Sequence, residues 1–166
     1  MRKLKKVVSI LLSIIMIVSL FNIVPFTANA AGGVEYIYRS WNADTQPVVD
    51  ETKTCSSYTE LSERSSDELE AGWYVVSSDL FIDSRLSVGS GTVNLILEDG
   101  AKLNVHRGIG VAPGTTLNIY GQSQGTGKLV VVFDPGDSRN DDNAMIGGTG
   151  SGGNAGDINI YGGVFR

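Results

Sequence analysis

The amino-acid sequence predicts an all-β protein that folds as a right-handed parallel β-helix, with three short strands in each coil of about 22 residues. Three observations support this prediction. From Gly72 onward the chain consists of very short apolar alternations separated by turns, one motif recurs along it, and no segment keeps the 3.6-residue period of a helix. The residues before Gly72 differ in composition and are predicted to have other roles.

The first thirty residues have the three-part layout of a secretory signal peptide. Four basic side chains lie within Met1–Lys6, an apolar stretch occupies 7–24, and the small-residue triplet Ala28–Ala30 follows. This layout predicts export with cleavage before Ala31, which leaves a secreted or cell-surface protein without a membrane segment. The alternative is an uncleaved anchor, because the apolar stretch is nearly long enough to span a bilayer.

The charge of the remaining 136 residues limits the kinds of partner. They carry 9 of the 13 basic and all 18 acidic groups, a net charge of −9. Phosphate backbones require a basic surface, so we do not expect a nucleic-acid partner. The single cysteine, Cys55, excludes a disulfide framework and a cysteine-based zinc site.

The segment 31–71 is predicted to be a polar N-terminal segment and a small cap. It is rich in Ser, Thr and Glu and contains only two glycines. A stack of coils has an open strand edge at each end, and a cap protects such an edge from aggregation. We therefore expect Leu61 and Leu69 to pack onto Trp73 in the first coil. The β-helix itself is assigned to 72–166 and is expected to be truncated, because a new coil begins just before Arg166.

The repeat is clearest where GTTLNIYG recurs as GDINIYG, which places Leu117 opposite Ile158. Extending the alignment backwards sets Leu95 opposite Leu117 and Trp73 opposite Leu95. We therefore expect these four side chains to form one column that points into the lumen. The intervals are 22, 22 and 41 residues, so the third unit carries insertions at its corners.

Each unit also contains two further apolar pairs with the alternation of a strand that shows one face to a core. A β-sandwich, the alternative fold, also has short alternating strands, but it does not predict that every third strand matches in sequence. The expected inward pairs are Trp73/Val75, Leu80/Ile82 and Leu86/Val88, then Leu95/Leu97, Leu103/Val105 and Ile109/Val111, then Leu117/Ile119, Leu129/Val131 and Met145/Ile146, with Ile158/Ile160 beginning a fourth unit.

The repeat region contains the segments GWYVVSSDLFI, VNLILEDGAKL, GIGVAPGTTLNIYGQSQGTGKL, AMIGG and GDINIYGG. Together these resemble the β-helix repeats of large secreted wall or surface proteins of Gram-positive bacteria, which are often labelled carbohydrate-binding or pectate-lyase-like by fold alone. The resemblance covers about Leu69 to the end of the chain. It implies surface display and contact with a glycan, and it transfers no catalytic residue.

Two tyrosines are the candidate glycan-binding residues. The alignment places Tyr120 and Tyr161 at equivalent outward positions of neighbouring coils, with Glu98 one coil below. Such a ladder offers an aromatic face on which the apolar C–H groups of a sugar ring can pack. The alternative is an ordinary outward stack that stabilises neighbouring strands. Asn118 and Asn159 form a parallel pair whose amides can hydrogen-bond along the stack.

An acidic loop, DPGDSRNDDN, is a candidate calcium site. Its carboxylates and amides are the hard oxygen ligands that Ca²⁺ prefers. Their spacing matches neither the EF-hand nor the calcium-binding β-roll pattern. A solvated acidic loop is the alternative. The candidate ligands are Asp134, Asp137, Asp141 and Asp142.

The sequence offers no constellation for catalysis. His106 is the only histidine and has no nucleophile in a recognisable arrangement around it. Glu98 and Asp99 are adjacent, so they point to opposite faces of a strand and make a poor hydrolytic pair. We expect a non-catalytic exported module that contacts a polysaccharide or cell-wall polymer, with no cofactor other than the calcium considered above. The alternatives are a structural spacer or adhesin segment without a ligand, and a fragment of a polysaccharide lyase.

Overall fold

The computed structural model describes residues 32–41, 44, 48–63, 65, 67–132, 144–148 and 154–166. The predicted signal at 1–30 lies outside these ranges. Within them the chain has no helix with the length and apolarity needed to cross a membrane. Also outside the described residues are the proposed calcium ligands Asp134, Asp137, Asp141 and Asp142.

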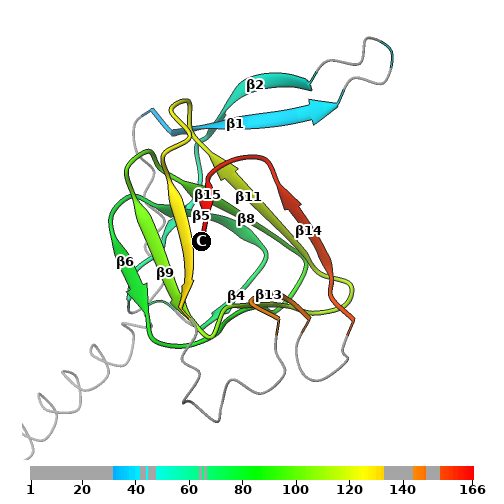
Figure 1. Ribbon diagram of the computed structural model, residues 1–166. Helices are drawn as coiled ribbons and strands as arrows, with labels where there is room; N and C mark the ends of the chain where they lie inside the picture. Colours follow the sequence, from blue (N-terminus) through cyan, green and yellow to red (C-terminus); the bar gives the residue numbers. More distant parts are fainter. Residues whose placement is uncertain are drawn as a thin grey trace, which may run out of the picture.

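The chain winds through three parallel sheets, so every third strand returns to the same sheet one coil further on (Figure 1). We give each sheet a name. A hairpin lies over the outer face of the covered sheet, no hairpin among the described residues lies over the open sheet, and the narrow sheet has the shortest strands. In order of hydrogen bonding, the covered sheet contains β3 (Thr59–Glu60), β5 (Gly72–Val76), β8 (Thr92–Leu97), β11 (Thr116–Gly121) and β14 (Asp157–Ile160); the open sheet contains β6 (Leu80–Ile82), β9 (Lys102–His106), β12 (Lys128–Val132) and β15 (Val164–Phe165); and the narrow sheet contains β4 (Glu68–Leu69), β7 (Leu86–Val88), β10 (Ile109–Val111) and β13 (Ile146–Gly147).

This arrangement confirms the predicted parallel β-helix and excludes the β-sandwich. Each pair within the three sheets is parallel, and the strands of one sheet come from successive coils. Tyr74 lies opposite Leu95, which lies opposite Ile119, so the two coils between them are 21 and 24 residues long. The average is close to the predicted repeat of 22.

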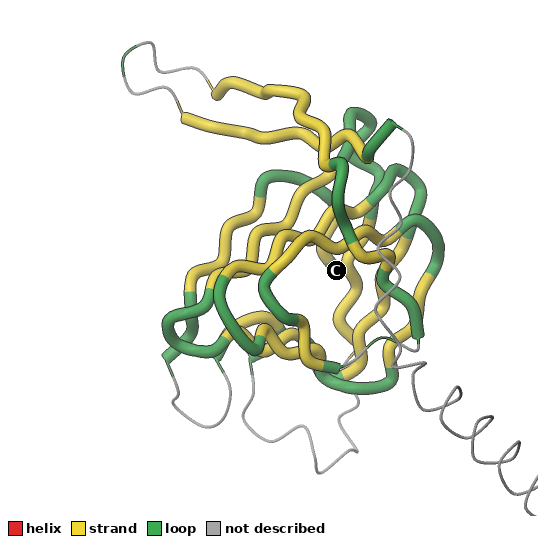
Figure 2. Tube along the Cα trace, turned by 180° about the vertical axis from the view of Figure 1, so that it is seen from behind, coloured by secondary structure: helices red, strands yellow, loops and turns green. Residues whose placement is uncertain are grey.

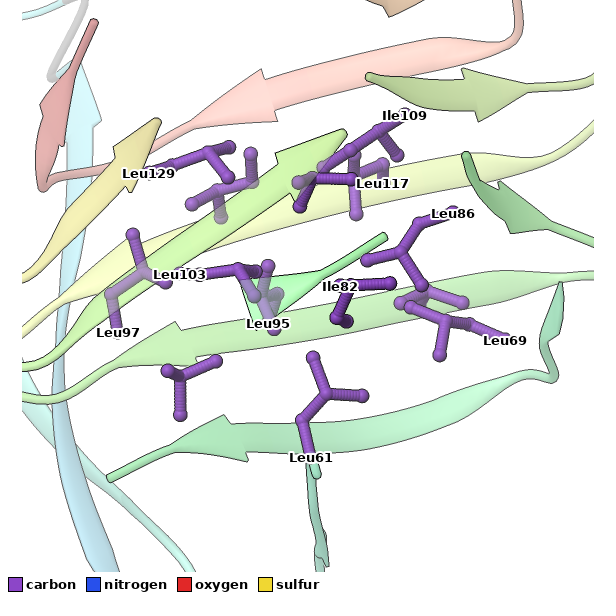
Figure 3. Close-up of a cluster of buried hydrophobic side chains, with 14 of the residues drawn as sticks. Leu61, Leu69, Ile82, Leu86, Leu95, Leu97, Leu103, Ile109, Leu117 and Leu129 are labelled. Carbon is purple, nitrogen blue, oxygen red and sulfur yellow. The ribbon is translucent and has the colours of Figure 1, made fainter. Parts of the chain in front are cut away.

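The core fills the lumen between the three sheets (Figure 3). Leu80, Leu103 and Leu129 form one column from the open sheet, and Leu86 and Ile109 form another from the narrow sheet. Most of these side chains are completely buried, and each contributes about 1.5–3 kcal/mol through removal of its apolar surface from water. The inward pairs predicted for these two sheets are therefore confirmed, with two exceptions. Met145 is exposed, so that only Ile146 packs on the core, and Val131 is partly buried, although its register with Val105 places it on the lumen side.

In the covered sheet, the predicted column of Trp73, Leu95, Leu117 and Ile158 is correct for its last pair and wrong for the earlier ones. Leu117 does pair with Ile158. However, the partner of Leu117 in β8 is Val93, and Leu95 pairs with Ile119. All of these side chains still point into the lumen, because a shift of two residues keeps a side chain on the same face. The shift arises because this coil is longer than the assumed 22 residues.

The predicted position of Trp73 is wrong by one residue, which reverses its face. Trp73 pairs with Asn94 and lies on the outside, whereas Tyr74 and Val76 pack in the lumen. Val75, also predicted to point inward, packs on the outside. The alternation misled here because both faces of β5 are buried, so apolar residues occur at successive positions.

The outer face of the covered sheet lies under an antiparallel hairpin of β1 (Val34–Trp41) and β2 (Val48–Cys55). Figure 1 shows the hairpin beside β11, with its far end extending away from the coils. The expected packing of Leu61 and Leu69 on Trp73 is wrong. Both leucines lie in the lumen cluster, while β3 and β4 pair with β5 and β7 as part of the first coil.

Candidate functional site

The two tyrosines chosen as glycan contacts do form a stacked pair. Tyr161 donates its backbone N–H to Ile119 O, and its ring stacks on Tyr120 with centroids 4.8 Å apart and an interplanar angle of 6°. Trp73 extends the stack on the other side, with its centroid 5.5 Å from that of Tyr120. The rings are held by strands of three different coils.

The hairpin covers this aromatic stack. Tyr36 of β1 contacts Trp73 and Tyr120 at centroid distances of 4.9 and 4.7 Å, and Tyr38 contacts Tyr161 at 5.1 Å. As a result Tyr120 is only 5% exposed, and burial is the main cause that raises the pKa of its phenol. Tyr161 is half-buried. The stack is therefore the core of the hairpin interface.

The expected position of Glu98 below Tyr120 is wrong. Ile96 pairs with Tyr120, and Glu98 lies two residues further along, where its N–H donates to Val76 O. Burial, followed by the nearby carboxylate of Glu60, raises the pKa of Glu98. The misplacement has the same cause as the shift of the lumen column.

The predicted asparagine pair is part of a longer ladder. Asn159 Nδ2 donates to Asn118 Oδ1 at 2.9 Å, and Asn118 Nδ2 donates to Asn94 Oδ1 at 2.8 Å. Asn94 was missed because the alignment was displaced in β8. Tyr120 Oη also donates to Asn94 Oδ1 at 3.4 Å, so the amide ladder and the aromatic stack support each other.

Among the described residues, no hairpin lies over the outer face of the open sheet. Phe81 lies between two lumen residues of β6 and is 46% exposed. Asn104 and Val130 occupy the matching outward positions of β9 and β12. Asn104 Nδ2 donates to Leu80 O at 3.2 Å, which fixes its amide beside the phenylalanine. We call this row, with the charged residues on either side of it, the open face.

Most of the charged groups on the open face are basic, although the chain as a whole is acidic. Lys128 lies directly opposite Lys102 in the register, and Lys102 Nζ lies 3.8 Å from a carboxylate oxygen of Asp79. On the other side of the row, His106 Nδ1 lies 2.9 Å from Asp83 Oδ1. The alternation also directs Arg166 outward, because Phe165 packs on the lumen core.

The open face was missed although the sequence contained the signal for it. Since Leu80/Ile82, Leu103/Val105 and Leu129/Val131 were correctly predicted to point inward, the residues between them had to point outward. A repeat alignment does not single out Phe81, Asn104 and Val130, because these outward residues differ from coil to coil, whereas the tyrosine recurs.

The described residues contain no group of three or more His, Cys, Asp or Glu side chains that could hold a metal ion. Cys55 is buried at the base of the hairpin, where its Sγ donates to Ser57 O at 3.2 Å. Burial raises the pKa of this thiol, which makes it a poor nucleophile.

No protein-family model matches the sequence, and comparisons with curated proteins and with solved structures give no significant match.

Proposed function

We propose that this chain is an exported, non-catalytic β-helix module that binds an acidic polysaccharide on its open face. The observation that supports this proposal is the combination of an exposed aromatic ring with two lysines at paired positions on the outer face of one sheet. Phe81 is 46% exposed, and Lys102 and Lys128 lie on adjacent strands. Both features lie on the outside of the β-helix, so a ligand can reach them without any change in the lumen core.

Each part of the open face matches one property of such a polymer. An aromatic ring provides an apolar surface for the C–H groups of a sugar, and the Asn104 carbonyl is an acceptor for hydroxyl groups. The two lysines attract carboxylates, which a neutral glycan lacks. Because neighbouring strands lie about 4.8 Å apart, a chain that runs along the β-helix axis meets equivalent outward positions in each coil.

The tyrosine stack has a different part in this proposal. Tyr120 supports the hairpin, since Tyr36 covers its ring. Tyr161 is half-buried, so part of its ring can still contact a sugar. We therefore keep Tyr161 as a second, smaller proposed glycan contact, separate from the open face. The two sites lie on different sheets, so substitutions can distinguish them.

Affinity electrophoresis in gels that contain polygalacturonate, with a neutral glucan as the comparison polymer, tests the proposal. We expect Phe81→Ala and Lys128→Glu each to reduce retardation by polygalacturonate at least fivefold, with little change in melting temperature. Arg39→Glu is the matched charge control, because it replaces a cation by a carboxylate at an exposed position of the hairpin.

Four outcomes separate the alternatives. Equal retardation of Lys128→Glu and the parent protein contradicts the open-face site. Loss of retardation only in Tyr161→Ala assigns binding to the exposed part of the Tyr161 ring. No retardation of the parent protein by any polymer favours a structural spacer, and unsaturated product absorbance with added Ca²⁺ favours a lyase.

A further inference from the structure

Strand β14 has a free edge. It pairs with β11 on one side and, among the described residues, has no strand on the other. The N–H groups of Asp157 and Tyr161 point to the β11 side, where they donate to Thr115 O, just before β11, and to Ile119 O within it. Alternate residues of a parallel strand direct their backbone groups to opposite sides, so Ile158 and Ile160 present theirs to the free edge.

The two ends of the described β-helix differ in how the lumen is closed. At the β3 end, Leu61 and Leu69 are buried and fill the lumen. At the β14 end, Ile158 is only partly buried and Ile160 is 54% exposed, although both belong to lumen columns. The free edge is therefore continuous with exposed apolar side chains, which is the combination that favours addition of another strand.

The hairpin extends past this edge. Tyr36 contacts rings from β5 and β11, and Tyr38 contacts Tyr161 after β14, so β1 runs in the direction in which coils are added. Three more residues of β1 follow Tyr38. At about 3.3 Å per residue they span about 10 Å, or two strand spacings of about 4.8 Å. Figure 2 shows this end of the hairpin projecting beyond the coils.

We infer that the free edge of β14 is a docking site for an extended polypeptide that adds a parallel strand beside it, next to the projecting hairpin. The register defines the chemistry of the occupant. Apolar residues must lie opposite Ile158 and Ile160, an asparagine opposite Asn159 and an aromatic residue opposite Tyr161. This is the pattern of the chain's own β11, so the partner is a strand of the same repeat type.

The inference rests on continuity with interactions already present in the sheet. Asn159 Nδ2 is used by Asn118, which leaves Asn159 Oδ1 to accept from the next amide of the ladder. A tyrosine at the next position repeats the 4.8 Å stack that Tyr161 makes with Tyr120. The docked strand thus extends the hydrogen bonds, the amide ladder and the lumen at the same time.

Amide hydrogen exchange of the full chain, with the synthetic peptide GTTLNIYG as the probe, tests the inference. The amides of Ile158 and Ile160 should exchange rapidly alone and be protected at least tenfold at saturating peptide. A control peptide, GTLTNIYG, places a threonine where the register requires the first apolar residue and should bind at least tenfold more weakly.

Ile160→Pro is the decisive variant. Proline removes the N–H that faces the free edge and leaves the hydrogen bonds to β11 in place, as is tolerated on edge strands. It should abolish peptide binding, whereas Ile160→Val should retain it. Equal binding by Ile160→Pro, or no protection of the two amides by the peptide, overturns the inference. Neither result depends on whether the open face binds a polysaccharide.

Discussion

Replacement of Tyr36 by alanine should release the hairpin without unfolding the coils. Tyr36 is 9% exposed and contacts the rings of Trp73 and Tyr120. Burial of an aromatic ring is worth about 1.5–3 kcal/mol, and each aromatic pair adds about 0.5–1.5 kcal/mol. The free energy that keeps the hairpin closed should therefore fall by about 3 kcal/mol, which corresponds to a roughly 100-fold increase in the open population.

The thiol of Cys55 reports this opening. It is buried at the base of the hairpin, so a thiol reagent reaches it only when the hairpin lifts from the sheet. Tyr36→Ala should raise the labelling rate about 100-fold, the ratio derived from about 3 kcal/mol. The melting temperature of the coils should change little, because Tyr36 is not in the lumen cluster.

Tyr36→Phe is the matched control and should label slowly, since it keeps the ring. Two results refute the reasoning. Unchanged labelling in Tyr36→Ala means that the aromatic stack does not hold the hairpin. A fall in melting temperature that accounts for the faster labelling means that the hairpin and the coils unfold together.

Three other predictions follow from packing and titration. Gly127→Ala should lower the free energy of unfolding by about 1–3 kcal/mol through overpacking, because a Cβ at this position would lie 2.6 Å from Leu97 O. Gly72→Ala is the control, since the nearest atom to its Cβ would be 3.9 Å away, and its free energy of unfolding in chemical denaturation should stay close to that of the parent protein. Burial raises the pKa of Tyr120, so between the ordinary tyrosine pKa of about 10 and the raised one only the unfolded chain ionises at this residue. Stability should therefore fall as pH rises above about 10. Tyr120→Phe should reduce this fall in a profile of melting temperature against pH. The raised pKa of Glu98 means that folding favours its protonated carboxyl, so the ionised form at pH 7 destabilises the fold. Glu98→Gln should therefore raise the melting temperature at pH 7, and this gain should disappear in acid. Equal melting temperatures of the variant and the parent protein at pH 7 contradict the burial of Glu98.

The fold could be predicted because each coil buries one face of its strands. Where the other face is open, as in β6 and β9, the alternation defined the inward side and Leu80, Leu103 and Leu129 were placed correctly. In β5 both faces are buried, so WYVV has no polar position to fix the phase, and Trp73 was placed on the wrong side.

The candidate site was harder to predict, because the hairpin was not recognised in the sequence. Tyr36 and Tyr38 alternate with other residues in β1, but nothing local indicates that they pack on rings that lie 37, 84 and 123 residues further along the chain. The stacking of Tyr120 on Tyr161 was therefore predicted correctly, but the exposure of the Tyr120 ring was predicted wrongly. Exposure depends on tertiary contacts, which a repeat alignment within the coils does not contain.

We propose that an acidic polysaccharide contacts the open face. Amide chemical-shift mapping during titration with an oligogalacturonate tests it most directly, because it locates the contact residue by residue. The proposal predicts that the largest changes fall on Phe81, Asn104 and Lys128, with the amides of Trp73 and Tyr120 unchanged. Changes confined to the hairpin and Tyr161, or no saturable change at any residue, would contradict it.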